Sequence, residues 1–396
     1  MREIKINEVT WYVGANDRKT PLFENNWPLP YGVSYNSYLI NDTRTALVDG
    51  IEFGSDPDYL RKIKKILNGK SLDYLVVNHL EPDHSGTISS VVAEYPQIKI
   101  VGNSQTAKIL KLYFNYNEES FHAVAEGDEL SLGKTNLKFF MIPWVHWPET
   151  MVTYNLTDKI LFSCDAFGGF GTLDGSIYDT DNNLEEHYIS EMRRYYSNIV
   201  AKYSIPVQKA LAKLAGARIE MICPSHGLIW KNPGKVLSLY GKWSGYESEK
   251  EIVIAYASMY GNTEHMADHI GSLLGEKGYK VHTYDVSKSH VSYILGMIWK
   301  CKAVLLGTCA YNGFMHPMME HLCNELKIAQ PKERLFGVFG SSSWNGAGVK
   351  CLLKFLEENK FETLSTTVEM SGSFAPEKIE ESAVKLAEAV DSAFQS

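Results

Sequence analysis

The chain has 396 residues, more than one hydrophobic core usually serves, so two or three domains are expected. Hydrophobic residues at 44% and charged residues at 22% are ordinary proportions for a soluble globular protein. The net charge of −8 argues against a general nucleic-acid binder, because phosphate binding needs a basic surface. No apolar run approaches the roughly 18 residues of a membrane span, and the N-terminus shows no apolar core of a secretory signal. We therefore expect a cytoplasmic protein with neither a membrane nor a nucleic-acid partner.

The hydrophobic pattern changes near residue 245. Before it, the sequence predicts hairpin-like strands and long helices, including a helix over 185–215 that is interrupted around Pro206. The polar segment 243–251 predicts a linker. The chain is thus expected to form one domain over 1–245 and a second over 251–396.

In the second domain, strands alternate regularly with helices. The strands are predicted at Ile252–Tyr256, Lys280–Tyr284, Ala303–Gly307, Leu335–Phe339 and Thr363–Val368. This α/β alternation predicts a doubly wound parallel sheet, which binds its ligands at the carboxyl ends of the strands.

In the first domain, buried strands end directly before residue types that bind metals. The candidate ligands are His79, Glu81, Asp83, His84, His146, Asp165 and His226. In an extended loop alternate side chains point the same way, so His79, Glu81 and Asp83 can converge, with His84 beside them. Four imidazoles and three carboxylates can hold two metal ions side by side. The carboxylate of Glu81 shifts the preference toward iron or manganese.

The order of these residues resembles the metallo-β-lactamase superfamily, whose zinc hydrolases carry His-x-His-x-Asp-His, with Glu81 standing at the second His. Together with His146, Asp165 and His226, the set resembles the flavodiiron proteins over the whole chain. The resemblance implies an N-terminal αββα metallo-β-lactamase-like domain with a non-haem diiron site. It implies that one iron is held by His79, Glu81 and His146, the other by Asp83, His84 and His226, with Asp165 bridging the two.

The strand predicted at 252–256 leads into the segment Ala257–Glu264, which is followed by a helical pattern. Small and hydroxyl residues ahead of a helix form a phosphate cradle, where backbone N–H groups point at the anion and Gly261 allows close approach. Loops at 308–313 and 341–346 follow the third and fourth predicted strands, and each offers an aromatic side chain.

These three loops resemble the flavodoxin family, which implies FMN as the cofactor, with the first loop at its phosphate and the other two beside its ring. The residues implied are Ser258, Met259, Tyr260, Gly261, Asn262, Thr263, Thr308, Ala310, Tyr311, Asn312, Gly313, Ser341, Ser342, Ser343, Trp344, Asn345 and Gly346.

No Gly-x-Gly-x-x-Gly occurs in the context of a nicotinamide-binding unit. None of the six cysteines forms a Cys-x-x-Cys pair, so a rubredoxin-type iron site has no ligand set. The chain therefore resembles the minimal two-domain class, which implies an external donor, either rubredoxin-like or a reduced deazaflavin. The family also implies a head-to-tail homodimer in which the FMN of one protomer faces the irons of the other. Two such dimers can assemble into a dimer of dimers.

The activity implied is reduction of dioxygen to water, of nitric oxide to nitrous oxide, or of both. Two alternatives remain open at this point: a metallo-hydrolase of the β-lactamase fold fused to a flavin domain, and a flavodoxin-like electron carrier with a vestigial metal site. By position in the family pattern, the candidates for tuning the pocket are Asn25, Trp27, Trp147, Phe167 and Tyr195.

Overall fold

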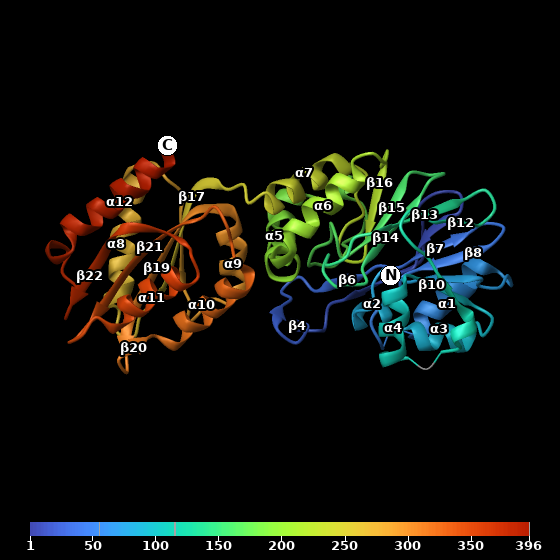
Figure 1. Ribbon diagram of the computed structural model, residues 1–396, viewed down its shortest axis with the longest axis horizontal. Helices are drawn as coiled ribbons and strands as arrows, with labels where there is room; N and C mark the ends of the chain where they lie inside the picture. Colours follow the sequence, from blue (N-terminus) through green and yellow to red (C-terminus); the bar gives the residue numbers. More distant parts are fainter. Residues whose placement is uncertain (55, 115, 396) are drawn as a thin grey trace. The chain divides into compact units, whose positions relative to one another are not determined.

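The computed structural model describes residues 1–54, 56–114 and 116–395. The chain forms two compact units, of which the first contains Met1–Tyr195 and Tyr203–Ser244, and the second contains Tyr196–Lys202 and Gly245–Ser396 (Figure 1). Helix α7 (Pro233–Ser244) ends the first unit, and strand β17 (Glu249–Ala257) begins the second sheet. The predicted linker is therefore shorter than 243–251, because Trp243 and Ser244 are buried on α7. Among the described residues, no helix is both long and apolar enough to cross a membrane.

Within its described residues, the first unit contains two main sheets. The first has the order β1 (Ile4–Lys5), β2 (Thr10–Tyr12), β7 (Tyr38–Asn41), β8 (Thr45–Val48), β9 (Tyr74–Val76), β10 (Lys99–Gly102) and β11 (Phe121–Ala123). The second has the order β12 (Glu129–Ser131), β13 (Asn136–Met141), β14 (Met151–Asn155), β15 (Ile160–Cys164) and β16 (Met221–Pro224). Two small ribbons pair β3 (Ala15–Asp17) with β6 (Val33–Tyr35) and β4 (Leu22–Phe23) with β5 (Trp27–Pro28).

Helices lie on both sides of these two sheets (Figure 1). They are α1 (Asp56–Leu67), α2 (Pro82–Ser85), α3 (Ile88–Glu94) and α4 (Ser104–Tyr113) on one side, and α5 (Ile189–Tyr195), α6 (Ser204–Leu214) and α7 on the other. Strands β8, β9, β14 and β15 are buried throughout, as expected where both faces of a sheet are covered. This confirms the predicted αββα architecture.

The prediction of one long helix over 185–215, interrupted around Pro206, is wrong in detail. The chain passes through a π-helical segment (Leu184–Tyr188), α5, a second π-helical segment (Tyr196–Val200) and a 3₁₀ turn (Ala201–Tyr203) before α6 begins. The break does not lie at Pro206, because this residue occupies the first turn of α6, where a missing N–H costs no helical hydrogen bond.

The second unit is the predicted doubly wound parallel sheet. Its strand order is β18 (Val281–Asp285), β17, β19 (Cys301–Tyr311), β21 (Leu335–Ser342) and β22 (Glu362–Ser371), and a short β20 (Phe314–Met315) folds back on β19. The helices are α8 (Asn262–Glu276), α9 (Val291–Lys300), α10 (Pro317–Ala329), α11 (Ala347–Glu358) and α12 (Glu380–Gln395). Buried apolar side chains such as Ile254, Leu305 and Phe339 form the core against α8 and α12. The order 2-1-3-4-5 is that of flavodoxin-like sheets, whose ligand crevice lies at the point where the strand order reverses.

Glu251 is a buried acidic residue at the start of β17, with 5% of its surface exposed. Its carboxylate lies 2.7 Å from Lys300 Nζ, 2.7 Å from His282 Nε2 and 3.2 Å from Lys280 Nζ. Burial alone would raise the pKa of Glu251, but these three hydrogen bonds outweigh it and lower the pKa from 4.5 to about 2.

We expect Glu251→Gln to lower the free energy of unfolding by about 2–3 kcal/mol at neutral pH. Because the folded pKa is depressed, this contribution is present above pH 4.5 and is lost as the pH falls toward 2. The difference in the free energy of unfolding between wild type and variant should therefore fall by roughly half near pH 3.5. Urea unfolding at both pH values measures it, with the exposed Glu357→Gln as control. A difference that does not change with pH would contradict this account.

Candidate metal centre and flavin pocket

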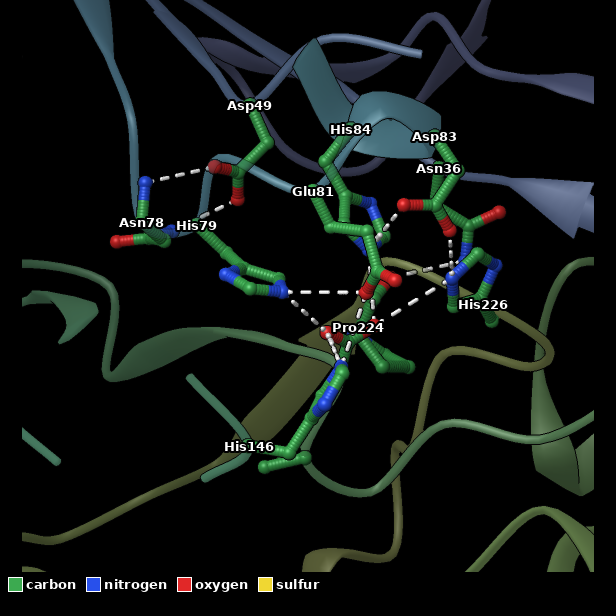
Figure 2. Close-up of polar contacts among 12 residues, drawn as sticks. Asn36, Asp49, Asn78, His79, Glu81, Asp83, His84, His146, Pro224 and His226 are labelled. Atoms are coloured by element: carbon green, nitrogen blue, oxygen red, sulfur yellow. Dashed lines mark hydrogen bonds and ion pairs between the residues drawn. The ribbon is translucent and has the colours of Figure 1, made fainter. Parts of the chain in front are cut away.

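All seven predicted ligands converge at the ends of strands in the first unit. Figure 2 labels six of them, all except Asp165. His79 and Glu81 lie in the loop after β9, and Asp83 and His84 lie on the single turn of α2, which begins at Pro82. The other three follow β13, β15 and β16. A register shift between Phe162 and Cys164 in β15 disrupts the pairing just before Asp165.

Three of the ligands form a first trio with one oxygen of Asp165. Glu81 Oε2 lies 3.0 Å from His146 Nε2 and 3.3 Å from His79 Nε2. Asp165 Oδ2 lies 3.3 Å from His79 Nε2 and 3.4 Å from His146 Nε2. These four side chains therefore surround one point, with nitrogen and oxygen atoms facing it.

The other three ligands form a second trio around the other oxygen of the same carboxylate. His226 Nε2 lies 3.0 Å from Asp83 Oδ2, and His84 Nε2 lies 3.4 Å from Asp83 Oδ1. Asp165 Oδ1 lies 2.9 Å from His84 Nε2 and 3.4 Å from His226 Nε2. Asp165 thus presents one oxygen to each trio, which is the arrangement required of a carboxylate that bridges two metal ions.

The donor atoms fit two metal ions. Both oxygens of Asp83, Oδ2 of Asp165 and Nε2 of His226 are buried, and in the part of the chain that the structure describes none of their contacts within the two trios has hydrogen-bond geometry. Buried polar atoms without a partner are costly, and metal ions would satisfy them. Imidazole and carboxylate ligands together suit iron.

The carboxylates also hold protons on the imidazoles when no metal competes. Burial opposes protonation of His146, but the nearby carboxylates of Asp165 and Glu81 outweigh it and raise its pKa to about 9. In the same way, burial opposes protonation of His226, while Asp165 and Asp83 raise its pKa to about 10. Metal binding must therefore release protons and should weaken as the pH falls.

The second unit has a polar cavity of about 240 Å³ at the carboxyl ends of its strands. It is lined by Ser258, Met259, Tyr260, Asn262, Cys309, Ala310, Ser341, Ser342, Ser343, Gly372 and Ser373. Ser258 Oγ accepts from Gly261 N at 3.1 Å, and Thr263 Oγ1 lies 2.8 Å from Ser341 Oγ. Gly261 has φ +87° and precedes the first residue of α8, so the loop presents a helix N-terminus to the cavity.

Several predicted flavin residues do not line the cavity themselves but lie on the loops and strand ends next to its lining residues. Thr308 is fully buried and accepts a hydrogen bond from His316 N. Asn312 and Gly313 make the turn between β19 and β20, and Asn345 and Gly346 precede α11. Tyr260, Trp344 and Tyr311 are exposed by 89%, 82% and 40%. A polar cradle at a helix N-terminus with exposed aromatic side chains on neighbouring loops fits a phosphate-bearing flat ring such as FMN.

Comparison with known proteins covers both units. Residues 33–227 match the family described as ODP family beta lactamase, and residues 254–385 match Flavodoxin. The anaerobic nitric oxide reductase flavorubredoxin of Escherichia coli O1:K1 is 31% identical over 90% of this chain and 75% of that protein. The chain belongs to the flavodiiron protein family.

Other relatives are similar over most of their length. An uncharacterized protein of Methanocaldococcus jannaschii, MJ0732, is 33% identical over 86% of each chain. The rubredoxin oxygen:oxidoreductase of Desulfovibrio gigas, at 28% identity, superimposes with a TM-score of 0.94 over 100% of both chains. A flavoprotein of Thermotoga maritima, at 29% identity, gives 0.90 over 98% of both chains.

Some predicted tuning residues of this flavodiiron protein contact the centre and others do not. Tyr195 donates its hydroxyl to Asp165 Oδ1 at 2.9 Å, and the ring centroid of Trp147 lies 5.1 Å from that of His79. Phe167 instead packs on Tyr240, with ring centroids 4.6 Å apart. Asn25 is exposed in the turn between β4 and β5.

The sequence reasoning missed several residues that lie at the two candidate sites. Glu24 accepts from Trp27 Nε1 at 2.9 Å. The residue as a whole is exposed, but partial loss of water around its carboxyl group and the negative charge of Glu81 raise its pKa to about 7. Glu149 and the carbonyl of Ser34 hold the outer nitrogens of two imidazoles. In the flavin cavity the omitted residues are Cys309, Gly372 and Ser373. Gly372 and Ser373 follow the fifth predicted strand, so the rule that ligands bind at carboxyl ends of strands could have found them.

Proposed function

We propose that this flavodiiron protein reduces dioxygen to water, nitric oxide to nitrous oxide, or both, with electrons from a rubredoxin-like carrier or a reduced deazaflavin. Reducing one dioxygen to two waters consumes four electrons and four protons, and reducing two nitric oxides to nitrous oxide and water consumes two of each. The observation that carries the proposal is the Asp165 carboxylate, which faces His79 and His146 with one oxygen and His84 and His226 with the other.

The residues would share the two irons as follows. His79, Glu81 and His146 would hold one, and Asp83, His84 and His226 would hold the other, with Asp165 between them. The bound groups would supply the redox chemistry: the irons bind the gas and reduce it, and FMN relays electrons from the donor. The protein keeps the donor atoms buried and fixed, and Tyr195 holds the carboxylate of Asp165 in place through its hydroxyl.

In the second unit, the loop from Ser258 to Thr263 would hold the FMN phosphate. Its hydroxyls and the backbone N–H groups at the start of α8 suit an anion. Residues 308–313 and 341–346 would flank the isoalloxazine ring, with Tyr311 and Trp344 as aromatic contacts.

The metallo-hydrolase alternative is not favoured, because the similarity to flavorubredoxin extends through both units. Metal and flavin analysis of protein produced in iron-replete cells tests the proposal. We expect about two irons and one FMN per chain. A single zinc without iron, together with cleavage of an ester or lactam, would contradict the proposal.

We also propose a head-to-tail homodimer in which the FMN of one protomer serves the irons of its partner. The exposed aromatic side chains at the flavin cavity, Tyr260 and Trp344, leave an apolar rim for a partner to cover. Assembly into a dimer of dimers and a cytoplasmic location stay predictions from the sequence.

Complementation between two inactive variants tests the dimer. Asp165→Ala lacks the bridging carboxylate, and Gly261→Val disturbs the flavin loop. After co-expression, random pairing makes about half of the dimers mixed, and each mixed dimer keeps one working pair of sites, so about a quarter of the wild-type activity should return. No activity above that of either variant alone would show that the flavin serves the irons of its own chain.

A further inference from the structure

The loop between β13 and β14 carries an acidic residue that contacts the metal centre from outside. Glu149 lies three residues after His146, and its side chain is fully buried. It is not among the seven ligands, and its carboxylate is directed at one of them.

One oxygen of this carboxylate makes two contacts. Glu149 Oε1 lies 2.8 Å from His79 Nδ1, and it accepts from the backbone N–H of Leu80 at 3.0 Å. The carboxylate therefore holds both the ring of His79 and the backbone next to it. A carboxylate can only accept, so Nδ1 carries the proton that faces Glu149, and Nε2, which lies 3.3 Å from both Glu81 Oε2 and Asp165 Oδ2, is the nitrogen that would bind a metal.

Glu149 is itself fixed by a neighbouring element. Asn103 Nδ2 donates to the Glu149 backbone carbonyl at 2.5 Å. The same Asn103 caps α4, because its Oδ1 accepts from the backbone N–H groups of Gln105 and Thr106. The position of the carboxylate is thus tied to the start of a ten-residue helix.

The other trio has a different outer partner. His226 Nδ1 lies 2.8 Å from the backbone carbonyl oxygen of Ser34, which carries no formal charge. A carboxylate makes an imidazole more basic than a neutral carbonyl does, so the two halves of the centre are supported unequally.

We propose that Glu149 is a positioning residue that sets the tautomer, orientation and basicity of His79, so that it governs the metal of the His79, Glu81 and His146 trio and leaves that of the other trio nearly unchanged. This inference rests on the proposed function in that both trios bind a metal. Loss of an outer partner of this kind typically weakens metal binding by about 10–100-fold.

The test is an anaerobic Co²⁺ titration of the full chain against a competing chelator, which resolves two dissociation constants and the visible spectrum of each site. In Glu149→Ala, one dissociation constant should rise by about 10–100-fold and the other by no more than about threefold. In His79→Ala, binding at the site that Glu149→Ala weakens, and the visible band of that site, should be lost. Glu149→Gln should recover part of the affinity, because its amide oxygen can still accept from His79 and Leu80. Asp179→Asn is the matched control, since Asp179 is a buried carboxylate whose oxygens accept from Lys231 N and Asn232 N rather than from any of the seven ligands.

The proposal would be overturned if Glu149→Ala weakened Co²⁺ binding equally at both sites, at neither site, or only at the site that His79→Ala leaves intact. It would also be overturned if Glu149→Gln bound Co²⁺ no more tightly than Glu149→Ala. Failure of the proposed function has a different signature, because wild-type protein would then bind fewer than two Co²⁺ ions in the same titration.

Discussion

Replacement of Asp165 by alanine is expected to abolish gas reduction, lowering turnover by at least about 10³-fold. Its two oxygens lie within 3.4 Å of an imidazole nitrogen in each trio, so no other side chain can substitute for it in both. The metal content should fall from two ions per chain to about one or fewer. Electrode assays of gas consumption together with metal analysis measure both effects.

Two further variants separate bridging from general destabilisation. Asp165→Asn keeps the shape of the side chain but has a single oxygen, so it can serve only one trio, and magnetic coupling between the irons should be lost. Asp179→Asn removes another buried carboxylate of the same unit, and it should keep both metals and most of the activity. Full activity in Asp165→Ala would contradict the diiron assignment.

Replacement of Gly261 by valine is expected to produce protein that contains iron but little FMN. Gly261 has φ +87°, and forcing an L-residue into that region costs about 1–2 kcal/mol, more for a β-branched side chain. The backbone N–H groups that would cradle the phosphate then move, so the Kd for FMN should rise by at least about tenfold. Flavin fluorescence during titration of deflavinated protein measures it.

Gly278→Val is the matched control, because Gly278 also has a positive φ, +88°, but lies in the turn after α8 and outside the flavin cavity. It should show a similar loss of stability with an unchanged Kd for FMN. Equal losses of FMN affinity in the two variants would mean that the effect arises from destabilisation of the whole unit.

The fold could be predicted where the pattern is local. The apolar runs of β17, β19 and β21 alternate with helical segments, and that spacing admits few arrangements besides a parallel sheet. The π-helical turns on either side of α5 were not predictable, because one extra residue per turn hardly changes the apolar periodicity. The turn between β4 and β5 was missed because Glu24 and Asn25 adopt positive φ values without a glycine to signal them.

The metal ligands could be predicted for a similar reason. His79 and Glu81 alternate in the loop after β9, and the three later ligands each follow a strand. The prediction that one extended loop also carries Asp83 is wrong, because Asp83 and His84 lie on the helical turn of α2 and face the second trio. Their outer partners could not be predicted, because Glu149 and Ser34 reach the imidazoles only after separate strands have come together. No spacing in the sequence distinguishes Glu149 from the chain's other acidic residues.

The central claim is that gas is reduced at the metal centre with electrons that arrive through FMN. Paired dioxygen and nitric oxide electrode assays test it most directly, with anaerobically prepared protein, and with chemically reduced rubredoxin and a reduced deazaflavin as alternative donors. We predict fast, repeated consumption of at least one gas by wild-type protein and none by Asp165→Ala. If protein that contains two irons and one FMN per chain consumed neither gas with either donor, the account would be wrong.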